Sequence, residues 1–305
     1  MSNKPGEGSS KDNSDPAPGR GSRNADAPAW PSGDIWANGI RLHYYRTGGN
    51  KPPLVLVHGF ADDGLCWTSV ARALERSYDV VMVDARGHGR SQAPARGYGP
   101  LDNADDLAGV IAGLKLPHPI VLGHSMGAMT VLVLAGRHPD LPGAVLLEDP
   151  PAWWMKDFPP PFTAQWHAQS KEWIAGFRRH SRMEIVAAQR REAPNWPEED
   201  LIPWADSKTR LSLSIFHQDV LPEMDWPRLL RGILCPVLLL TADPERGAIV
   251  TDAQAASLRA MVPHLSIAHI AGAGHNIHRD QSARFLEVVR AFMEELPSVN
   301  FGSSS

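Results

Sequence analysis

Residues 119–127 read PIVLGHSMG, and they are the strongest indication of the fold in this sequence. The apolar run Pro119 to Gly123 leads into a Gly-x-Ser-x-Gly motif, and a helical pattern, Gly127 to His138, follows it. A serine in a sharp strand-to-helix turn needs glycines on both sides, because neighbouring side chains would clash there. The turn lifts the serine hydroxyl clear of the sheet, and the helix behind it directs a positive dipole end toward it. The stretch therefore predicts a nucleophilic Ser125.

Short aliphatic runs alternate with helical patterns on both sides of this motif. Such alternation is typical of an α/β fold with a mostly parallel sheet flanked by helices, which is the fold class we predict. The first run alternates in polarity like an exposed strand. The expected strands are Ile40 to Tyr45, Pro53 to His58, Val80 to Asp84, Pro119 to Gly123, Ala144 to Glu148, Val237 to Thr241 and Leu265 to Ile270. The expected helices are Trp67 to Arg76, Ala104 to Leu114, Gly127 to His138, Asp252 to Val262 and Gln281 to Glu295.

The alternation stops between residues 150 and 230, where many prolines and two arginine pairs occur. We interpret 150–230 as an inserted helical cap, and 30–149 with 231–297 as the core. Most tryptophans of this segment should fill the cap's own interior, while one or two should face the substrate. The seven tryptophans of this region are Trp153, Trp154, Trp166, Trp173, Trp196, Trp204 and Trp226.

The two ends of the chain are poor in aliphatic residues. Residues 1–29 are rich in Gly, Ser, Asn, Asp and Pro, and residues 298–305 end in a glycine and three serines. Such segments cannot bury enough apolar surface to offset the entropy lost on ordering. We expect both tails to be disordered.

The composition limits the partners. A net charge of −4 at pH 7 favours neither nucleic acid nor an anionic membrane. Cys66 and Cys235 lie in no metal-binding motif, so we expect two free thiols, no metal and no cofactor. No apolar run reaches membrane-spanning length, and the first residues lack the apolar core of a signal peptide. We expect a cytoplasmic monomer or homodimer.

A serine hydroxyl needs a base to become a good nucleophile. His275 lies in Gly272-Ala273-Gly274-His275-Asn276, a glycine-rich loop between the last expected strand and the last helix. This position is at the carboxyl edge of the sheet, beside the nucleophile. His278 shares the loop without flanking glycines, so we expect His275 to be the base.

The oxyanion hole needs two backbone N–H groups, one of them from the residue after the nucleophile. Met126 supplies this first group. His58-Gly59-Phe60 follows an early strand, and the N–H of Phe60 is the expected second donor. We expect the His58 side chain to support the loop through hydrogen bonds.

These segments together resemble the α/β-hydrolase superfamily, in its cap-bearing esterase, lactonase and dehalogenase-like branch. The resemblance spans about residues 35–296 and rests on four segments in the right order. The family implies that residues 84–91 form a structural loop, so Asp84, Arg86 and His88 are expected to be scaffold. The four segments are residues 58–60 (HGF), 84–91 (DARGHGRS), 123–127 (GHSMG) and 274–275 (GH).

The resemblance leaves two positions open for the acid that orients the base. Asp243 follows the expected strand Val237 to Thr241, which is the commoner place for the acid in this family. It comes earlier after that strand than the usual Gly-x-x-Asp spacing would place the acid. Glu148 ends another strand, at a site that resembles the acid position of haloalkane dehalogenases and zearalenone-type lactonases. We favour Glu148 over Asp243, and we interpret Asp149 as a structural residue at the strand end.

Dehalogenases and epoxide hydrolases of this fold use a carboxylate nucleophile, whereas the motif here holds Ser125. A serine with a histidine and an oxyanion hole suits cleavage of a carboxylic ester or lactone through an acyl-enzyme. A carbon–carbon bond hydrolase, a cofactor-free oxygenase and a small-molecule receptor of the same fold stay open. The tryptophans favour an apolar or aromatic substrate. Expected pocket residues are Phe60, Asp62, Trp67, Met126, Trp153 and Trp154.

Overall fold

The computed structural model describes residues 30–158, 163–216, 223–262 and 264–296. The two tails that we expect to be disordered, residues 1–29 and 298–305, lie outside the described residues. Every expected strand and helix of the core is present with bounds that differ by at most a few residues. The predicted fold class, a mostly parallel sheet flanked by helices, is confirmed.

Eight strands form one sheet in the order β1-β2-β4-β3-β5-β6-β7-β8. The ladder from β4 to β8 is parallel, and β1 and β2 join it as antiparallel strands at one edge. The carboxyl ends of the parallel strands therefore meet at one edge of the sheet, where side chains from distant segments can converge. The strands are β1 (Ser32–Ala37), β2 (Ile40–Arg46), β3 (Pro53–Val57), β4 (Asp79–Val83), β5 (Ile120–His124), β6 (Ala144–Glu148), β7 (Val237–Ala242) and β8 (Leu265–Ile270).

The edge of the sheet differs from the sequence prediction. The sequence pattern does not predict strand β1, because its residues form no apolar run and only Ala37 is buried. Strand β2 was expected to be exposed, but it lies between β1 and β4 and buries residues on both faces. Because β1 covers its edge, β2 is more buried than its alternating sequence indicates. The sequence of β1 gives no clear sign of this strand.

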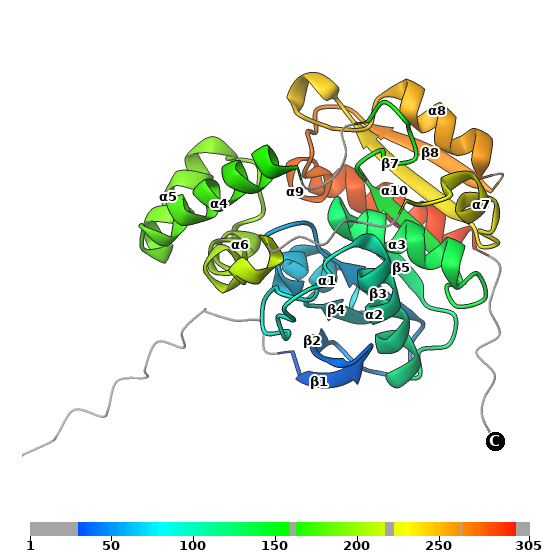
Figure 1. Ribbon diagram of the computed structural model, residues 1–305, viewed down its shortest axis with the longest axis horizontal. Coiled ribbons are helices and arrows are strands. Elements are labelled where there is room, and N and C mark those ends of the chain that lie inside the picture. Colours follow the sequence, from blue (N-terminus) through cyan, green and yellow to red (C-terminus); the bar gives the residue numbers. More distant parts are fainter. Residues whose placement is uncertain (1–29, 159–162, 217–222, 263, 297–305) are drawn as a thin grey trace, which may run out of the picture.

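Helices cover both faces of the sheet (Figure 1). One face packs against α2 (Pro100–Gly113), α3 (Met126–Arg137), α7 (Trp226–Arg231) and α8 (Asp252–Met261). The other face packs against α1 (Thr68–Leu74), α9 (Ile277–Asp280) and α10 (Ser282–Glu294). Short 3-10 turns are η1 (Gly64–Trp67), η2 (Leu213–Phe216) and η3 (Pro244–Arg246). The apolar runs of the parallel strands are buried because both faces are covered.

Between β6 and β7 the chain forms α4 (Ala164–Arg178), α5 (Arg182–Glu192) and α6 (Glu198–Arg210). These three helices lie together, away from the layers that cover the sheet (Figure 1). Their own small core includes Ile185, Leu201 and Trp204. Helix α6 contacts η1 and α1, so it reaches the carboxyl edge of the sheet.

Candidate active site

Ser125 occupies the turn between β5 and α3. Its backbone has φ 53° and ψ −115°, a strained conformation for a residue with a side chain. A Cβ atom on Gly123 would lie 2.4 Å from the backbone of Gly127, and one on Gly127 would lie 2.2 Å from the carbonyl oxygen of Val57. Both glycines are therefore required by close backbone contacts, as the sequence predicted.

The helix after Ser125 begins with Met126. The carbonyl oxygen of Ser125 accepts the first helical hydrogen bond, from the N–H of Met129 at 3.0 Å. The N–H groups of the first turn have no helical acceptor, so they point out of the helix toward the turn. The positive end of the α3 dipole therefore lies at Ser125.

Asp149 is the carboxylate that contacts His275. Its Oδ2 atom lies 2.6 Å from Nδ1 of His275, and the Asp149 side chain is fully buried. The N–H groups of Ile249 and Val250 donate to the same carboxylate at 2.9 to 3.1 Å. Asp149 has φ 43°, a left-handed conformation that aspartate tolerates better than most residues. This kink turns the side chain toward His275.

The expectation that Glu148 orients His275 is wrong in the structure. The Oε1 atom of Glu148 accepts hydrogen bonds from the backbone N–H and from Nδ1 of His278, at 2.9 and 2.8 Å. Successive residues of a strand point to opposite faces, so Glu148 faces the layer of α9 and α10. Burial raises the pKa of Glu148 to about 7 and lowers that of His278.

The alternative acid, Asp243, does not contact His275 either. Its carboxylate accepts from the N–H of Gly272 at 2.7 Å and lies 3.0 Å from Nε2 of His269. The bond from Gly272 is the main reason why the pKa of Asp243 is lowered. Asp243 thus holds the start of the glycine-rich loop and does not reach the base. The interpretation of Asp149 as a structural residue is wrong, because its carboxylate contacts His275. Its place after a strand at the carboxyl edge of the sheet is the sequence signal for this contact.

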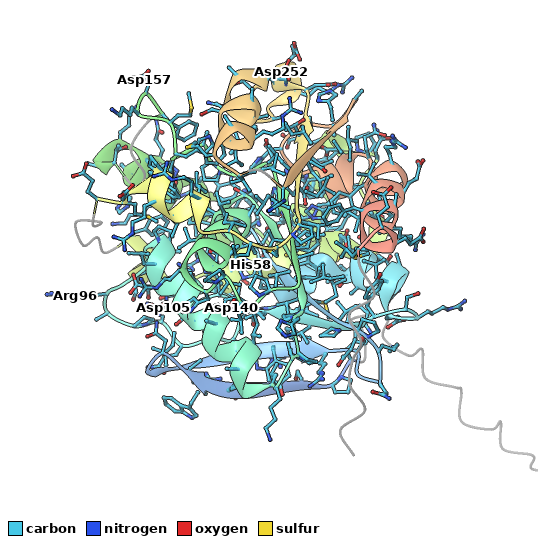
Figure 2. All side chains as sticks on the ribbon, turned by 90° about the vertical axis from the view of Figure 1, so that its right-hand side faces the viewer. His58, Arg96, Asp105, Asp140, Asp157 and Asp252 are labelled. Carbon is cyan, nitrogen blue, oxygen red and sulfur yellow. The ribbon has the colours of Figure 1, made fainter. Side chains whose placement is uncertain are left out.

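The loop after β3 carries the expected second oxyanion donor. The carbonyl oxygen of Gly59 accepts from Nδ1 of His58 at 2.8 Å and from the N–H of Asp62 at 3.2 Å. Nε2 of His58 accepts from the N–H of Ala85 at 3.0 Å. His58 lies inside the molecule, in contrast to Arg96 at its periphery (Figure 2). The expected supporting role of His58 is confirmed by these bonds, while the donor role of Phe60 stays a prediction.

A cavity of about 650 Å³ opens at Ser125 and His275. Of the expected pocket residues, Phe60, Asp62, Met126 and Trp153 line it. Trp67 and Trp154 do not line it: Trp67 stacks on His278, and the indole of Trp154 donates to the carbonyl oxygen of Gln254. The further lining residues are His124, Pro151, Phe158, Trp166, Trp173, Phe177, Gln189, Glu192, Trp196, Trp204, Lys208, Ile249 and Asn276. Five tryptophans thus face the cavity, more than the one or two expected.

One buried ionic cluster borders the cavity. Nζ of Lys208, on α6, lies 2.6 Å from Oδ1 of Asp62 and 2.9 Å from the carbonyl oxygen of Ala61. Arg279, on α9, donates to Oδ2 of Asp62 at 2.8 Å. The two cations hold the pKa of Asp62 well below its usual range despite burial. The sequence analysis does not single out Lys208. Its only local signal is Trp204, one helical turn earlier, whose ring centroid lies 4.6 Å from Nζ of Lys208.

The loop of residues 84–91 makes the structural contacts expected of scaffold. Asp84 accepts from the N–H groups of Gly64 and Arg90, both at 2.7 Å. Arg86 forms a bidentate pair with Asp106. These bonds tie the end of β4 to the neighbouring loop and to α2, outside the reaction centre.

Cys66 and Cys235 are both free, as expected, and both are buried. Burial raises the pKa of the Cys235 thiol to about 11 and holds that of the Cys66 thiol well above its usual value. Within the described ranges, no group of three or more His, Cys, Asp or Glu side chains is arranged to hold a metal ion. None of the helices in the part of the chain that the structure describes is long and apolar enough to cross a membrane.

Comparison with known proteins adds relatives of the same architecture. A family model described as "Alpha/beta hydrolase family" matches residues 54–288. N-formylmaleamate deformylase from Pseudomonas putida is 29% identical over 274 residues, which cover 86% of this chain and 96% of the relative. The solved N-formylmaleamic acid deformylase from Pseudomonas putida S16 is 26% identical, with a TM-score of 0.69, over 85% of this chain and 100% of that one. The enol-lactonase from Burkholderia xenovorans LB400 shares the fold at 22% identity, with a TM-score of 0.61, over 86% of this chain and all of its own.

Proposed function

Since the chain belongs to the alpha/beta hydrolase family, we propose that it is a serine hydrolase that cleaves a carboxylic ester or lactone of an apolar or aromatic small molecule. One observation carries this proposal. Ser125, in its strained turn, lines the same cavity as His275, and Nδ1 of His275 is held by the buried carboxylate of Asp149.

The first step is attack of the Ser125 hydroxyl on the substrate carbonyl. An ionised carboxylate only accepts hydrogen bonds, so the contact with Asp149 places a proton on Nδ1 of His275. Nε2 is then the basic nitrogen and takes the proton of Ser125 as the Ser125–carbonyl bond forms. The negative charge of Asp149 stabilises the imidazolium that results.

The tetrahedral intermediate then collapses. Its oxyanion is stabilised by the N–H groups of Phe60 and Met126, which both border the cavity. His275 returns the proton to the leaving alkoxide, and the acyl group stays on Ser125. A water molecule, deprotonated by Nε2 of His275, next attacks the acyl carbon and releases the acid and the free Ser125 hydroxyl.

The lining of the cavity favours a neutral substrate. Eight aromatic side chains border it and provide large apolar contact area. The two oppositely charged buried residues in the wall, Lys208 and Asp62, are paired with each other, and Asp62 also binds Arg279. Nζ of Lys208 already has three oxygen partners, so its charge is not directed at a substrate carboxylate.

Residues 150–230 serve in this proposal as a cap over the reaction centre. Helices α4 to α6 and the turns around them supply Trp166, Trp173, Trp196 and Trp204 to the cavity. The core supplies Ser125 and the loops around it. The cap therefore determines which acyl or alcohol groups fit, while the core performs the reaction.

A second candidate is hydrolysis of an amide by the same residues. It is favoured by the similarity to N-formylmaleamate deformylase, which extends over 86% of this chain and 96% of that protein. With an amide, His275 would protonate a leaving nitrogen in place of an alkoxide. The paired charges in the cavity argue against an anionic substrate of the kind named for that relative.

Burst and steady-state kinetics test both candidates. Neutral p-nitrophenyl esters of increasing acyl length, the half-ester p-nitrophenyl hydrogen succinate, dihydrocoumarin and N-formylmaleamate would be compared. We expect a burst with the neutral esters, turnover of the lactone, and little turnover of the two anions. Preference for N-formylmaleamate would favour the second candidate, and an absence of turnover with all four would contradict both.

Three variants serve as controls in these assays. Ser125→Ala and His275→Ala should each lose about 10⁴-fold or more in kcat. His180→Ala removes an exposed histidine that follows α4 and should keep wild-type kinetics. Wild-type activity in Ser125→Ala would show that the measured turnover has another origin.

A further inference from the structure

A second carboxylate–histidine pair lies directly beside the Asp149–His275 pair. Glu148 and His278 are both almost completely buried, with side-chain exposures of 0% and 2%. The Glu148 carboxylate accepts from the backbone N–H of His278 and, at 2.8 and 2.9 Å through its two oxygens, from Nδ1. Neither residue borders the cavity formed by the described part of the chain. The pair therefore does not touch a substrate bound there.

The second pair connects segments that carry the reacting groups. The backbone N–H of Ser125 donates to the carbonyl oxygen of Glu148 at 2.9 Å, and Asp149 follows Glu148 directly. His278 lies three residues after His275, which is about one helical turn. The side chains of Glu148 and His278 thus join the strand ends that hold the nucleophile and the acid to the segment that holds the base.

The segment that carries His275 is short and depends on contacts with other elements. Helix α9 has four residues and no side-chain cap at its N-terminus, and the loop before it contains Gly272 and Gly274. Two other contacts position His275: its Nδ1 atom meets Asp149, and its carbonyl oxygen lies 2.9 Å from Nε2 of His124. The bonds from His278 to Glu148 tie this short segment to the end of β6. Arg279, which donates to Asp62, ties it to another loop.

Packing fixes the ring of His278 as well. The Trp67 ring lies 4.4 Å from the His278 ring, tilted by 31°, so the two are stacked. The next residue, Arg279, donates to Asp62 in the loop that follows Phe60. The base segment is therefore linked to the expected oxyanion loop through the residue beside His278.

We propose that Glu148 and His278 are positioning residues, which hold His275 at the distance and angle that proton transfer with Ser125 requires. The kinetic part of this inference rests on the proposed hydrolase function, but the geometric part does not. A displacement of about 1 Å at a reacting group can lower the rate by about 100-fold, so a buried tie of this kind can control kcat.

A stable apolar replacement tests the proposal. Exchange of both partners of a buried hydrogen-bonded pair for apolar residues of similar shape can leave stability nearly unchanged or raise it. The double variant Glu148→Leu/His278→Leu should therefore fold, while kcat falls about 30- to 100-fold and KM stays within about two-fold. A merely structural pair would change the melting temperature and leave kcat as in wild type, and that result would overturn the proposal.

Two single variants separate hydrogen bonding from charge. Glu148→Gln keeps an acceptor for both bonds from His278 and should keep kcat within about five-fold, whereas Glu148→Met has similar volume without an acceptor and should approach the double variant. Equal activity of the Gln and Met variants would contradict the proposal. This test does not require the double variant to fold. His138→Asn, in a carboxylate–histidine pair with Asp105 outside the site, is the matched control and should match wild type.

A measurement without substrate separates this inference from the proposed function. Nitrogen NMR of histidine-labelled protein reports the tautomer and mobility of His275. We expect one Nδ1-protonated His275 in wild type and in Glu148→Gln, and a broadened or shifted signal in Glu148→Met. An unchanged His275 signal in Glu148→Met would overturn the positioning role even if the enzyme were inactive on every ester.

Discussion

The two carboxylate–histidine pairs at the end of β6 are alike in chemistry and different in surroundings. Asp149 and Glu148 are adjacent in sequence, both fully buried, and each contacts a histidine of the 275–278 segment. The His275 side chain is 31% exposed and borders the cavity, whereas the His278 side chain is 2% exposed and stacks on Trp67. Only the Asp149–His275 pair has access to the cavity and can exchange protons with a substrate. The Glu148–His278 pair can act only by supporting the first pair.

This difference arises from one backbone residue. A regular strand would send Glu148 and the following side chain to opposite faces. The left-handed conformation of Asp149 ends the strand and aims its carboxylate at the Ile249 and Val250 amides and at His275. Four variants test whether the two carboxylate–histidine pairs differ in this way.

The largest effect is expected from Asp149→Asn. An amide in this place can favour the wrong tautomer of His275 and cannot stabilise its charged form, so kcat should fall by about 10³- to 10⁴-fold. Steady-state kinetics on the best ester measure this loss against Glu148→Gln. A greater loss in Glu148→Gln would reverse the roles of the two pairs.

The next effect concerns His124, whose ring centroid lies 4.7 Å from that of His275 and 5.3 Å from that of His278. Burial lowers the pKa of His124 to about 3. The unfolded chain binds a proton below its pKa of about 6.5 while the folded chain does not. The stability that results is complete above pH 6.5 and is lost as the pH falls toward 3, in total about 5 kcal/mol.

His124→Asn should therefore flatten the rise of the unfolding free energy between pH 4 and 6, by about 1 kcal/mol per pH unit. Urea unfolding at several pH values measures it, with His180→Ala as a control that keeps the wild-type slope. A slope in His124→Asn equal to that of wild type would show that His124 is not held neutral between the two pairs.

Glu148 should give a smaller effect with the opposite sign. Burial raises its pKa to about 7, so the folded protein binds a proton between pH 4.5 and 7 that the unfolded chain has released. This contribution is complete below pH 4.5 and is lost as the pH rises through 7, in total about 3 kcal/mol.

Relative to wild type, Glu148→Gln should therefore gain stability as the pH rises from 5 to 8. The difference between the unfolding free energies of the two proteins in urea, at each pH, measures this gain. A constant difference over that range would mean that the pKa of Glu148 is not raised by burial, which would contradict this account of the second pair.

The smallest effect is expected for Asp243→Asn. The asparagine oxygen can still accept from the N–H of Gly272, and the residue does not contact His275. The kcat value should stay within about two-fold of wild type in the ester assay. A loss as large as that of Asp149→Asn would restore Asp243 as the acid.

The reliable sequence predictions were local ones. The requirement for Gly123 arises within the five-residue motif, from the backbone of Gly127, whereas Gly127 itself lies against the backbone of β3. The helix after Ser125 and the strand before it are visible as periodic patterns. The position of His275 in a loop after the last strand follows from the topology of a parallel sheet. Apart from the close approach of Gly127 to β3, these features can be predicted without knowing which distant side chains meet.

The acid and the cavity depend on distant contacts and were harder to predict. Which of Glu148 and Asp149 meets His275 is decided by a left-handed backbone and by two amides 100 residues away. The rotation of α4 to α6 decides that Trp166, Trp173, Trp196 and Trp204 face the cavity. Lys208 likewise depends on its contact with Asp62, 146 positions earlier in the chain. Sequence periodicity alone does not contain this information.

The most direct test is the rate at which a small fluorophosphonate modifies Ser125, followed by intact mass and peptide mapping. The wild type should form one adduct, on Ser125. Modification should slow by about 100-fold or more in Asp149→Asn and by no more than about five-fold in Glu148→Gln. An adduct on another residue, no adduct at all, or equal rates in wild type and Asp149→Asn would contradict a Ser125 nucleophile activated by the Asp149–His275 pair.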